Sequence, residues 1–153
     1  MGFLQWFREN QEDAASQLAL PLGNGNELEP QAQHDYQAIT QRKHIRDQYE
    51  ATIQEKMGSG KLRQDPVLGQ ATEAMTREIF GCGVSDLYKE TGSKPKQRNT
   101  LPPVAQNAYM VGESFATDAL ENSDIQGSKD QRRQQIVGKA ADAGNRARKR
   151  MPW

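Results

Sequence analysis

Apolar residues recur every three or four positions over most of the chain beyond residue 30. This spacing is typical of helices that bury one face and expose the other. No segment shows the alternation of apolar and polar residues that indicates a strand. The pattern predicts five helices, at about residues 31–57, 66–80, 85–91, 103–120 and 129–147.

Glycine, proline and small polar residues mark the ends of these helices. Glycines at positions 58, 81 and 92 follow the last apolar residue of three of them, where a helix is readily terminated. Asp65 before Pro66 predicts a helix start, because a carboxylate accepts a free amide and proline fits the first turn. Thr100 is expected to cap the helix that follows Pro102 and Pro103.

The fold class that this pattern predicts is all-α, a small helical bundle with a flexible N-terminal tail. Residues 1–30 form the expected tail, residues 31–150 the helical domain and residues 151–153 a short C-terminal tail. In the helix at 103–120, the positions expected to face the core are Val104, Ala108, Val111, Phe115, Ala119 and Leu120.

The predicted tail carries two apolar clusters, of which the first contains Phe3, Trp6 and Phe7. If this cluster is helical, Phe3 and Phe7 lie on one side and form a hydrophobic anchor for a second protein. Docking of the same rings on the chain's own bundle explains the cluster equally well. Binding to a membrane is disfavoured, because Arg8 is the only cation nearby.

The second cluster reads Gln17-Leu18-Ala19-Leu20-Pro21-Leu22. It resembles the hexapeptide by which bacterial replication and repair proteins dock on the DNA polymerase sliding clamp, glutamine-leucine-any-leucine-any-leucine, and all four defining positions match. The resemblance implies that Leu20 and Leu22 enter an apolar pocket while Leu18 lies along its edge. Gln17 would fix the register through its amide, and Pro21 would stiffen the extended form. In the alternative, the three leucines fold back onto the bundle.

Composition limits the size of the core and the class of protein. Of the 153 residues, 35% are hydrophobic and 7% aromatic, and the mean hydropathy is −0.92. We therefore expect a modest core. The sequence shows no run of about 18 apolar residues and no secretory signal, and this predicts a cytoplasmic protein.

Charge is balanced overall but not along the chain. Residues 1–60 hold 5 basic and 9 acidic residues, residues 61–125 hold 7 and 9, and residues 126–153 hold 8 and 2. Because a polyanion responds to a local field, the last segment is the candidate for nonspecific contact with DNA. A solvated helix end that complements the helix dipole is the competing explanation. The residues expected to contact nucleic acid are Arg132, Arg133, Lys139, Arg146, Arg148, Lys149 and Arg150.

Residue types suited to covalent or metal chemistry are sparse. Cys82 is the only cysteine, and together with His34 and His44 it cannot build a structural zinc site. The turn at residues 58–61 ends like a phosphate loop, but it lacks the first glycine and the Ser or Thr that would hold magnesium. No acid/base pair stands out, so the sequence predicts no catalysis, no cofactor and no metal.

A second resemblance covers residues 87–148. The elements that carry it are Leu87-Tyr88 before a glycine-containing turn, Glu113 and Ala116-Thr117 in a helix, and Val137-Gly138-Lys139 leading to Arg146. In this pattern the segment is similar to the C-terminal helical part of the bacterial DNA-damage-inducible protein D family. The resemblance implies a DNA-maintenance setting and assigns no binding residue.

Together these features predict a non-enzymatic accessory factor of bacterial DNA replication or repair that docks on the sliding clamp. Recruitment of the chain to the clamp and competition with polymerases are equally compatible with the motif. The alternative is a small helical scaffold or membrane-peripheral adaptor, in which both N-terminal apolar clusters bind an assembly partner.

Overall fold

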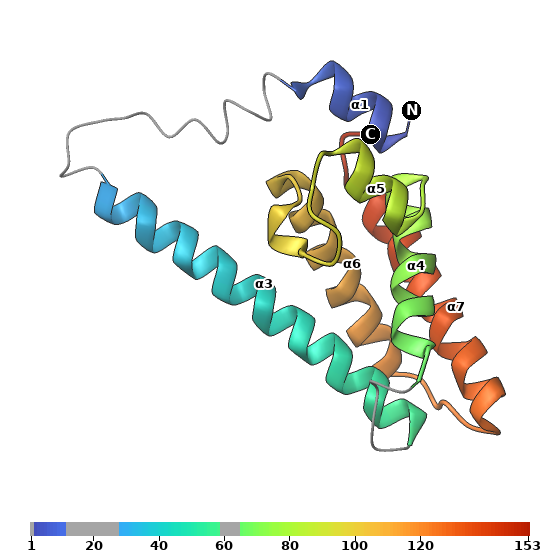
Figure 1. Ribbon diagram of the computed structural model, residues 1–153. Helices are drawn as coiled ribbons and strands as arrows, with labels where there is room; N and C mark the ends of the chain where they lie inside the picture. The colour runs from blue at the N-terminus through green and yellow to red at the C-terminus, as the bar shows by residue number, and fades with distance from the viewer. Residues whose placement is uncertain (1, 12–27, 59–64) are drawn as a thin grey trace.

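The structure is a computed structural model that describes residues 2–11, 28–58 and 65–153, with side chains omitted for residues 28–36. Within these ranges it contains α-helices, one short 3-10 turn and no strand, so the all-α class is confirmed. All five predicted helices occur (Figure 1). In chain order the elements are α1 (Phe3–Glu9), α3 (Leu28–Met57), α4 (Val67–Phe80), α5 (Val84–Glu90), η2 (Arg98–Thr100), α6 (Pro103–Glu121) and α7 (Lys129–Arg148).

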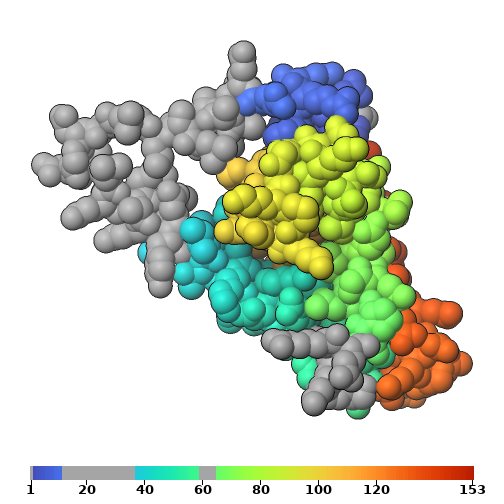
Figure 2. Space-filling view, in the orientation of Figure 1, coloured from blue at the N-terminus to red at the C-terminus, as the bar shows by residue number. Residues whose placement is uncertain are grey.

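Helix α7 is the centre of the arrangement, because it packs along both α4 and α6. Helix α3 lies against α6 through its C-terminal half, and its N-terminal end stands apart from the other helices (Figure 1). Helix α1 and the C-terminus of the chain lie together at the end of the bundle where α5 is found. The space-filling view shows α1 resting on this end (Figure 2).

Small residues form the faces by which α6 and α7 meet their neighbours. The buried positions of α7 are Ile136, Ala140, Ala143, Gly144 and Ala147. Such residues let helix backbones approach closely and let a core form with little apolar volume. The buried positions of α6 are Ala105, Ala108, Tyr109, Gly112, Glu113, Ala116 and Leu120.

The buried face of α6 is therefore rotated from the predicted one. Gly112 lies at the centre of this buried face, against α4. A Cβ atom there would lie 2.9 Å from Ile79 Cδ1 and 3.0 Å from Met75 Sδ. A larger residue at this position would require the side chains of Ile79 and Met75 to shift. Four of the positions expected to point inward are only half-buried at the edge of this face, namely Val104, Val111, Phe115 and Ala119.

The helix ends follow the capping chemistry at most of the expected places. Asp65 accepts a hydrogen bond from the backbone amide of Val67 at 2.9 Å, as predicted for the start of α4. Helix α7 begins with a capping box in which Ser128 and Gln131 each satisfy a backbone amide of the other. The prediction for Thr100 is wrong, because its hydroxyl accepts from the amide of Lys94 within the preceding loop.

The close approach of α7 to α4 makes a sharp prediction for Gly144. A Cβ atom at this position would lie 2.7 Å from the carbonyl oxygen of Met75 and 3.0 Å from Glu78 Cβ. Since backbone atoms must move to make room, Gly144→Ala should lower the free energy of unfolding by about 1–3 kcal/mol. Urea denaturation followed by circular dichroism measures the change.

Gly138, on the same helix, is the matched control. A Cβ atom at Gly138 would have no neighbour within 4 Å among the described residues. Gly138→Ala should therefore raise the free energy of unfolding by about 0.5–1 kcal/mol through helix propensity alone. Equal effects of the two substitutions would contradict the close approach.

Candidate functional site

The predicted clamp-binding residues lie outside the described part of the chain. Gln17, Leu18, Leu20, Pro21 and Leu22 all fall between the end of the first described range and the start of the second. Their place in the sequence is between α1 and α3, two elements that belong to the described structure. The interpretation of these residues as a docking peptide stays a prediction.

The aromatic residues near the N-terminus lie in the chain's own core. The Phe3 ring is fully buried, with ring centroids 4.9 Å from Phe80 and 4.7 Å from Trp153. Phe7 packs on Phe3 at 5.5 Å, and Trp6 lies 5.3 Å from Trp153. In the structure this cluster docks on the chain's own bundle, which is one of the two interpretations of its sequence.

This docking changes the expected domain boundaries. The sequence pattern places residues 3–9 in the tail, but as α1 they are part of the helical domain. The C-terminal end is held in the same place, because the indole Nε1 of Trp153 donates a hydrogen bond to the carbonyl oxygen of Ile79 at 2.8 Å. The aromatic rings pair in stacked, tilted and edge-on arrangements, which stabilise the contact beyond area burial.

The predicted DNA-binding cations lie at three places along α7 and just after it. At the start of the helix, Arg132 donates to the carbonyl oxygens of Gly127 and Lys56 at 3.0 and 3.2 Å. Arg133 pairs with Asp130 at 2.7 Å and lies 3.5 Å from Asp65. These two side chains attach α7 to the loop before it, to the end of α3 and to Asp65 before α4.

At the other end of α7, Arg146 and Arg150 lie over the ring of Phe115. The guanidinium carbons are 4.5 and 5.2 Å from the ring centroid, within the range of cation–π attraction. Lys149 between them is exposed, and Arg148 is half-buried. The surface expected to contact DNA is therefore limited to the residues at the C-terminal end of α7. It includes the ring of Phe115 from α6.

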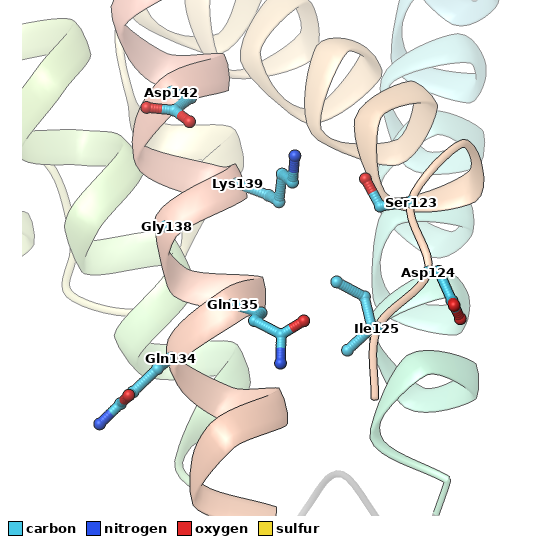
Figure 3. Close-up of a pocket in the computed structure, with 8 residues that line it drawn as sticks. All are labelled: Ser123, Asp124, Ile125, Gln134, Gln135, Gly138, Lys139 and Asp142. Atoms are coloured by element: carbon cyan, nitrogen blue, oxygen red, sulfur yellow. The ribbon is translucent and has the colours of Figure 1, made fainter. Parts of the chain in front are cut away.

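Lys139 lines a hollow of about 420 Å³ between α7 and the chain that follows α6. Figure 3 shows Lys139 and Gln135 extending from α7 toward Ser123 and Ile125. The Gln135 amide donates to the carbonyl oxygens of Gln126 and Gln131. The hollow is polar and open, and its ionic side chains do not converge on one point (Figure 3). The full lining is Ser123, Asp124, Ile125, Gln134, Gln135, Gly138, Lys139 and Asp142.

A different group of ionic residues converges on Glu113, which is 2% exposed. Its Oε1 atom accepts hydrogen bonds from Arg46 of α3, at 2.7 Å, and from Arg98 of η2. The Arg98 guanidinium also stacks 4.0 Å from the ring centroid of Tyr109. Tyr109 shares a hydrogen bond of 2.7 Å with Thr76 of α4. One buried carboxylate thus connects three elements of the chain.

The local electrostatics favour the charged form of Arg46. Burial lowers the pKa of Arg46, but attraction by Glu113 and Glu50 outweighs it, so the pKa lies above its ordinary value. Burial also raises the pKa of Tyr109 to about 12, so its phenol is neutral at physiological pH. Arg46 therefore presents guanidinium charge beside a neutral Tyr109 phenol.

These residues border a cleft of about 450 Å³ between α3, α6 and the turn that carries Arg98. The face that holds α3 and this turn is visible in Figure 2. Ile39 of α3 is 61% exposed beside the cleft. The complete lining is Ile39, Arg42, Lys43, Arg46, Arg98, Asn99, Gln106, Tyr109, Met110 and Glu113.

Sequence reasoning did not single out this cleft as a site. A signal was present, because Glu113 lies four residues after Tyr109 and three before Ala116, which is the spacing of a buried helix face. An acid on such a face requires a cationic partner. Which cations supply it depends on contacts made across more than sixty residues from α3, as in the Arg46 pair.

The remaining residues suited to covalent or metal chemistry lie apart from this cleft. Cys82 is half-buried, and burial raises its pKa to about 11, so the thiol is protonated at neutral pH. His44 is exposed on α3. Among the described residues, no group of three or more His, Cys, Asp or Glu side chains could hold a metal ion. None of the described helices combines the length and apolar content needed to cross a membrane.

Comparison with known protein families, curated proteins and solved structures finds no match for this chain.

The docking of α1 makes a testable prediction. Phe3→Ala removes a fully buried ring that contacts Phe80 and Trp153, so the free energy of unfolding should fall by about 3–5 kcal/mol. Gln5→Ala, on the exposed side of the same helix, should change it by less than about 0.5 kcal/mol. Urea denaturation of both variants measures the difference, and similar midpoints would show that α1 does not pack on the core.

Proposed function

We propose that this chain is a non-enzymatic accessory protein of bacterial DNA replication or repair, which acts in the cytoplasm and docks on the DNA polymerase sliding clamp through residues 17–22. The observation that carries the proposal is the match at every defining position of the clamp-binding hexapeptide. A chain of this composition would contain such a match by chance about once in two hundred cases. The resemblance of residues 87–148 to a DNA-damage-inducible family supports the same setting.

The chemistry of the peptide suits this form of recognition. Leu18, Leu20 and Leu22 are spaced so that an extended chain directs them to neighbouring apolar pockets. Pro21 disfavours a helix through the segment and limits the conformational entropy lost on binding. The Gln17 amide both donates and accepts hydrogen bonds, as a residue that sets the register must.

The hexapeptide is connected to the helical domain at both of its ends, so docking would hold this domain beside the clamp. The hexapeptide is followed by α3, and it is preceded by α1, whose Phe3 and Phe7 are buried in the core. A domain held beside the clamp would meet clamp-encircled DNA at an effective concentration of order millimolar. A weak second contact with DNA then suffices.

The last turn of α7 is the surface we assign to this second contact. Arg146, Lys149 and Arg150 are exposed there, and the guanidinium groups over Phe115 keep donor edges available for phosphate oxygens. Contacts of this type position a protein on DNA without reading its sequence.

Clamp docking is tested by titrating the full chain into purified bacterial sliding clamp and following fluorescence anisotropy of a label. The wild-type chain should saturate the clamp, and the double substitution Leu20→Ala with Leu22→Ala should weaken binding at least about tenfold because both pocket contacts are lost. The matched control is Asn24→Ala with Asn26→Ala, which changes the same tail outside the motif and should bind like the wild type. Absence of saturable binding, or equal binding by all three chains, would refute the proposal.

DNA contact is tested by measuring affinity for a nonspecific duplex over a range of salt concentrations. Lys149→Ala should weaken binding and reduce the slope of log affinity against log salt by about one. Lys129→Ala removes the same charge from the opposite, exposed end of α7 and should leave the slope unchanged. A salt-independent affinity, or the same loss in both variants, would contradict the assignment.

A further inference from the structure

We propose that the cleft between α3, α6 and the Arg98 turn binds a small phosphate-bearing ligand, with the phosphate beside Arg42 and an apolar part of the ligand against Ile39. The proposal is independent of clamp docking, because it depends only on described residues of the helical domain. It assigns a function to a group of cations that neither the hexapeptide nor the end of α7 uses.

The charge lining the cleft is unbalanced. Four of its ten lining residues are cationic and one is a carboxylate. Lys43 and Arg46 are in part compensated by their neighbours on α3, since Lys43 pairs with Asp47 at 2.6 Å and Arg46 with Glu50 at 2.7 Å. Positive charge remains after these carboxylates are counted, and it is concentrated at one side chain.

That side chain is Arg42. Among the described residues its guanidinium pairs only with neutral amides, at 3.2 Å from Gln106 Oε1 and 2.9 Å from Asn107 Oδ1. Its Nε atom is buried and has no hydrogen-bond partner within the described structure. A buried donor without an acceptor is unfavourable. An anion in the cleft would supply the missing negative charge beside the Arg42 guanidinium.

Glu113 makes the site rigid before any ligand arrives. By accepting from both Arg46 and Arg98, it holds two guanidinium groups from different elements at fixed positions. Stacking of Arg98 on Tyr109 restricts the turn further. Cations held in this way lose little side-chain entropy when an anion binds, which favours affinity.

Size and lining select the class of ligand. A volume of about 450 Å³ lies in the usual range for small-molecule sites, about 300–1,000 Å³. Guanidinium groups on several sides match the three or more oxygens of a phosphate better than the two of a carboxylate. Ile39 and Met110 add an apolar wall, so an organic phosphate suits the cleft better than inorganic phosphate does.

Calorimetric titration of the full chain with inorganic pyrophosphate tests the anion site. Saturable binding is expected, and Arg42→Gln should weaken it at least about tenfold because the guanidinium charge is lost. The matched control is Arg77→Gln on α4. Arg77 is 66% exposed, and among the described residues it pairs with its own helix neighbour Glu73. This control should stay within about twofold of the wild type.

The outcomes separate the site from a general attraction of anions. Equal losses in the two variants, or no saturable heat with the wild-type chain, would overturn the proposal. Circular dichroism and urea denaturation establish that Arg42→Gln is folded, and Arg42→Lys provides a second variant. Because lysine lacks the planar guanidinium fork, Arg42→Lys should recover only part of the affinity, and full recovery would overturn the role given to the guanidinium.

Two further binding measurements distinguish a small organic phosphate from inorganic phosphate and from nucleic acid. Phenyl phosphate should bind several-fold more tightly than inorganic phosphate, and Ile39→Ser should abolish this difference while leaving pyrophosphate affinity unchanged. An absent difference would overturn the apolar part of the assignment. A short single-stranded oligonucleotide should not displace pyrophosphate, and Arg42-dependent displacement would overturn the small ligand in favour of nucleic acid.

Discussion

The close contact between α7 and α4 at Gly144 is the constraint on which the rest of this fold depends. A side chain at Gly144 would collide with the backbone of Met75, so the two helices can meet only where one of them has no Cβ atom. Gly112 of α6 makes a milder contact of the same kind, since a Cβ atom there would meet the side-chain ends of Ile79 and Met75 on α4. Only 35% of the residues are hydrophobic, and a core of adequate density is reached by bringing backbones together rather than by filling space with large side chains. The order of α4, α7 and α6 follows, and with it the position of each surface that carries charge.

Helix α3 is attached to this bundle in two chemically different ways. Its C-terminal half buries Tyr49, Ile53 and Met57, which is ordinary hydrophobic packing. Further toward its N-terminus the contact is ionic, through Arg46 and the buried Glu113. Helix α3 moves away from α6 beyond that point (Figure 1), and the cleft opens where apolar packing gives way to paired charge. The same carboxylate therefore fixes α3 and borders the proposed ligand site.

Helix positions could be predicted from the sequence because they are set locally, by capping residues such as Asp65 that act within one turn of where they stand. The buried face of α6 could not, because the rule that large apolar residues point inward favours Phe115 over Gly112, and the structure reverses this order where two helices nearly touch. The cleft beside Glu113 could not be predicted either, because Arg46 of α3 and Glu113 of α6 are far apart in the sequence. Likewise, residue type showed that Phe3 needed a partner, and only the fold decided that the partner was internal.

Stability alone does not account for the group of charges around Glu113. Removing charges from water costs nearly as much as their attraction returns, so well-packed apolar residues of similar size often stabilise a protein as well or better. Two arginines held by one carboxylate, and a third with a buried, unpaired Nε, are therefore an inefficient way to attach a helix. What the arrangement provides, and apolar packing would not, is fixed positive charge beside a cavity. A site for an anion uses that charge, which explains why the cations are held in place before any ligand binds.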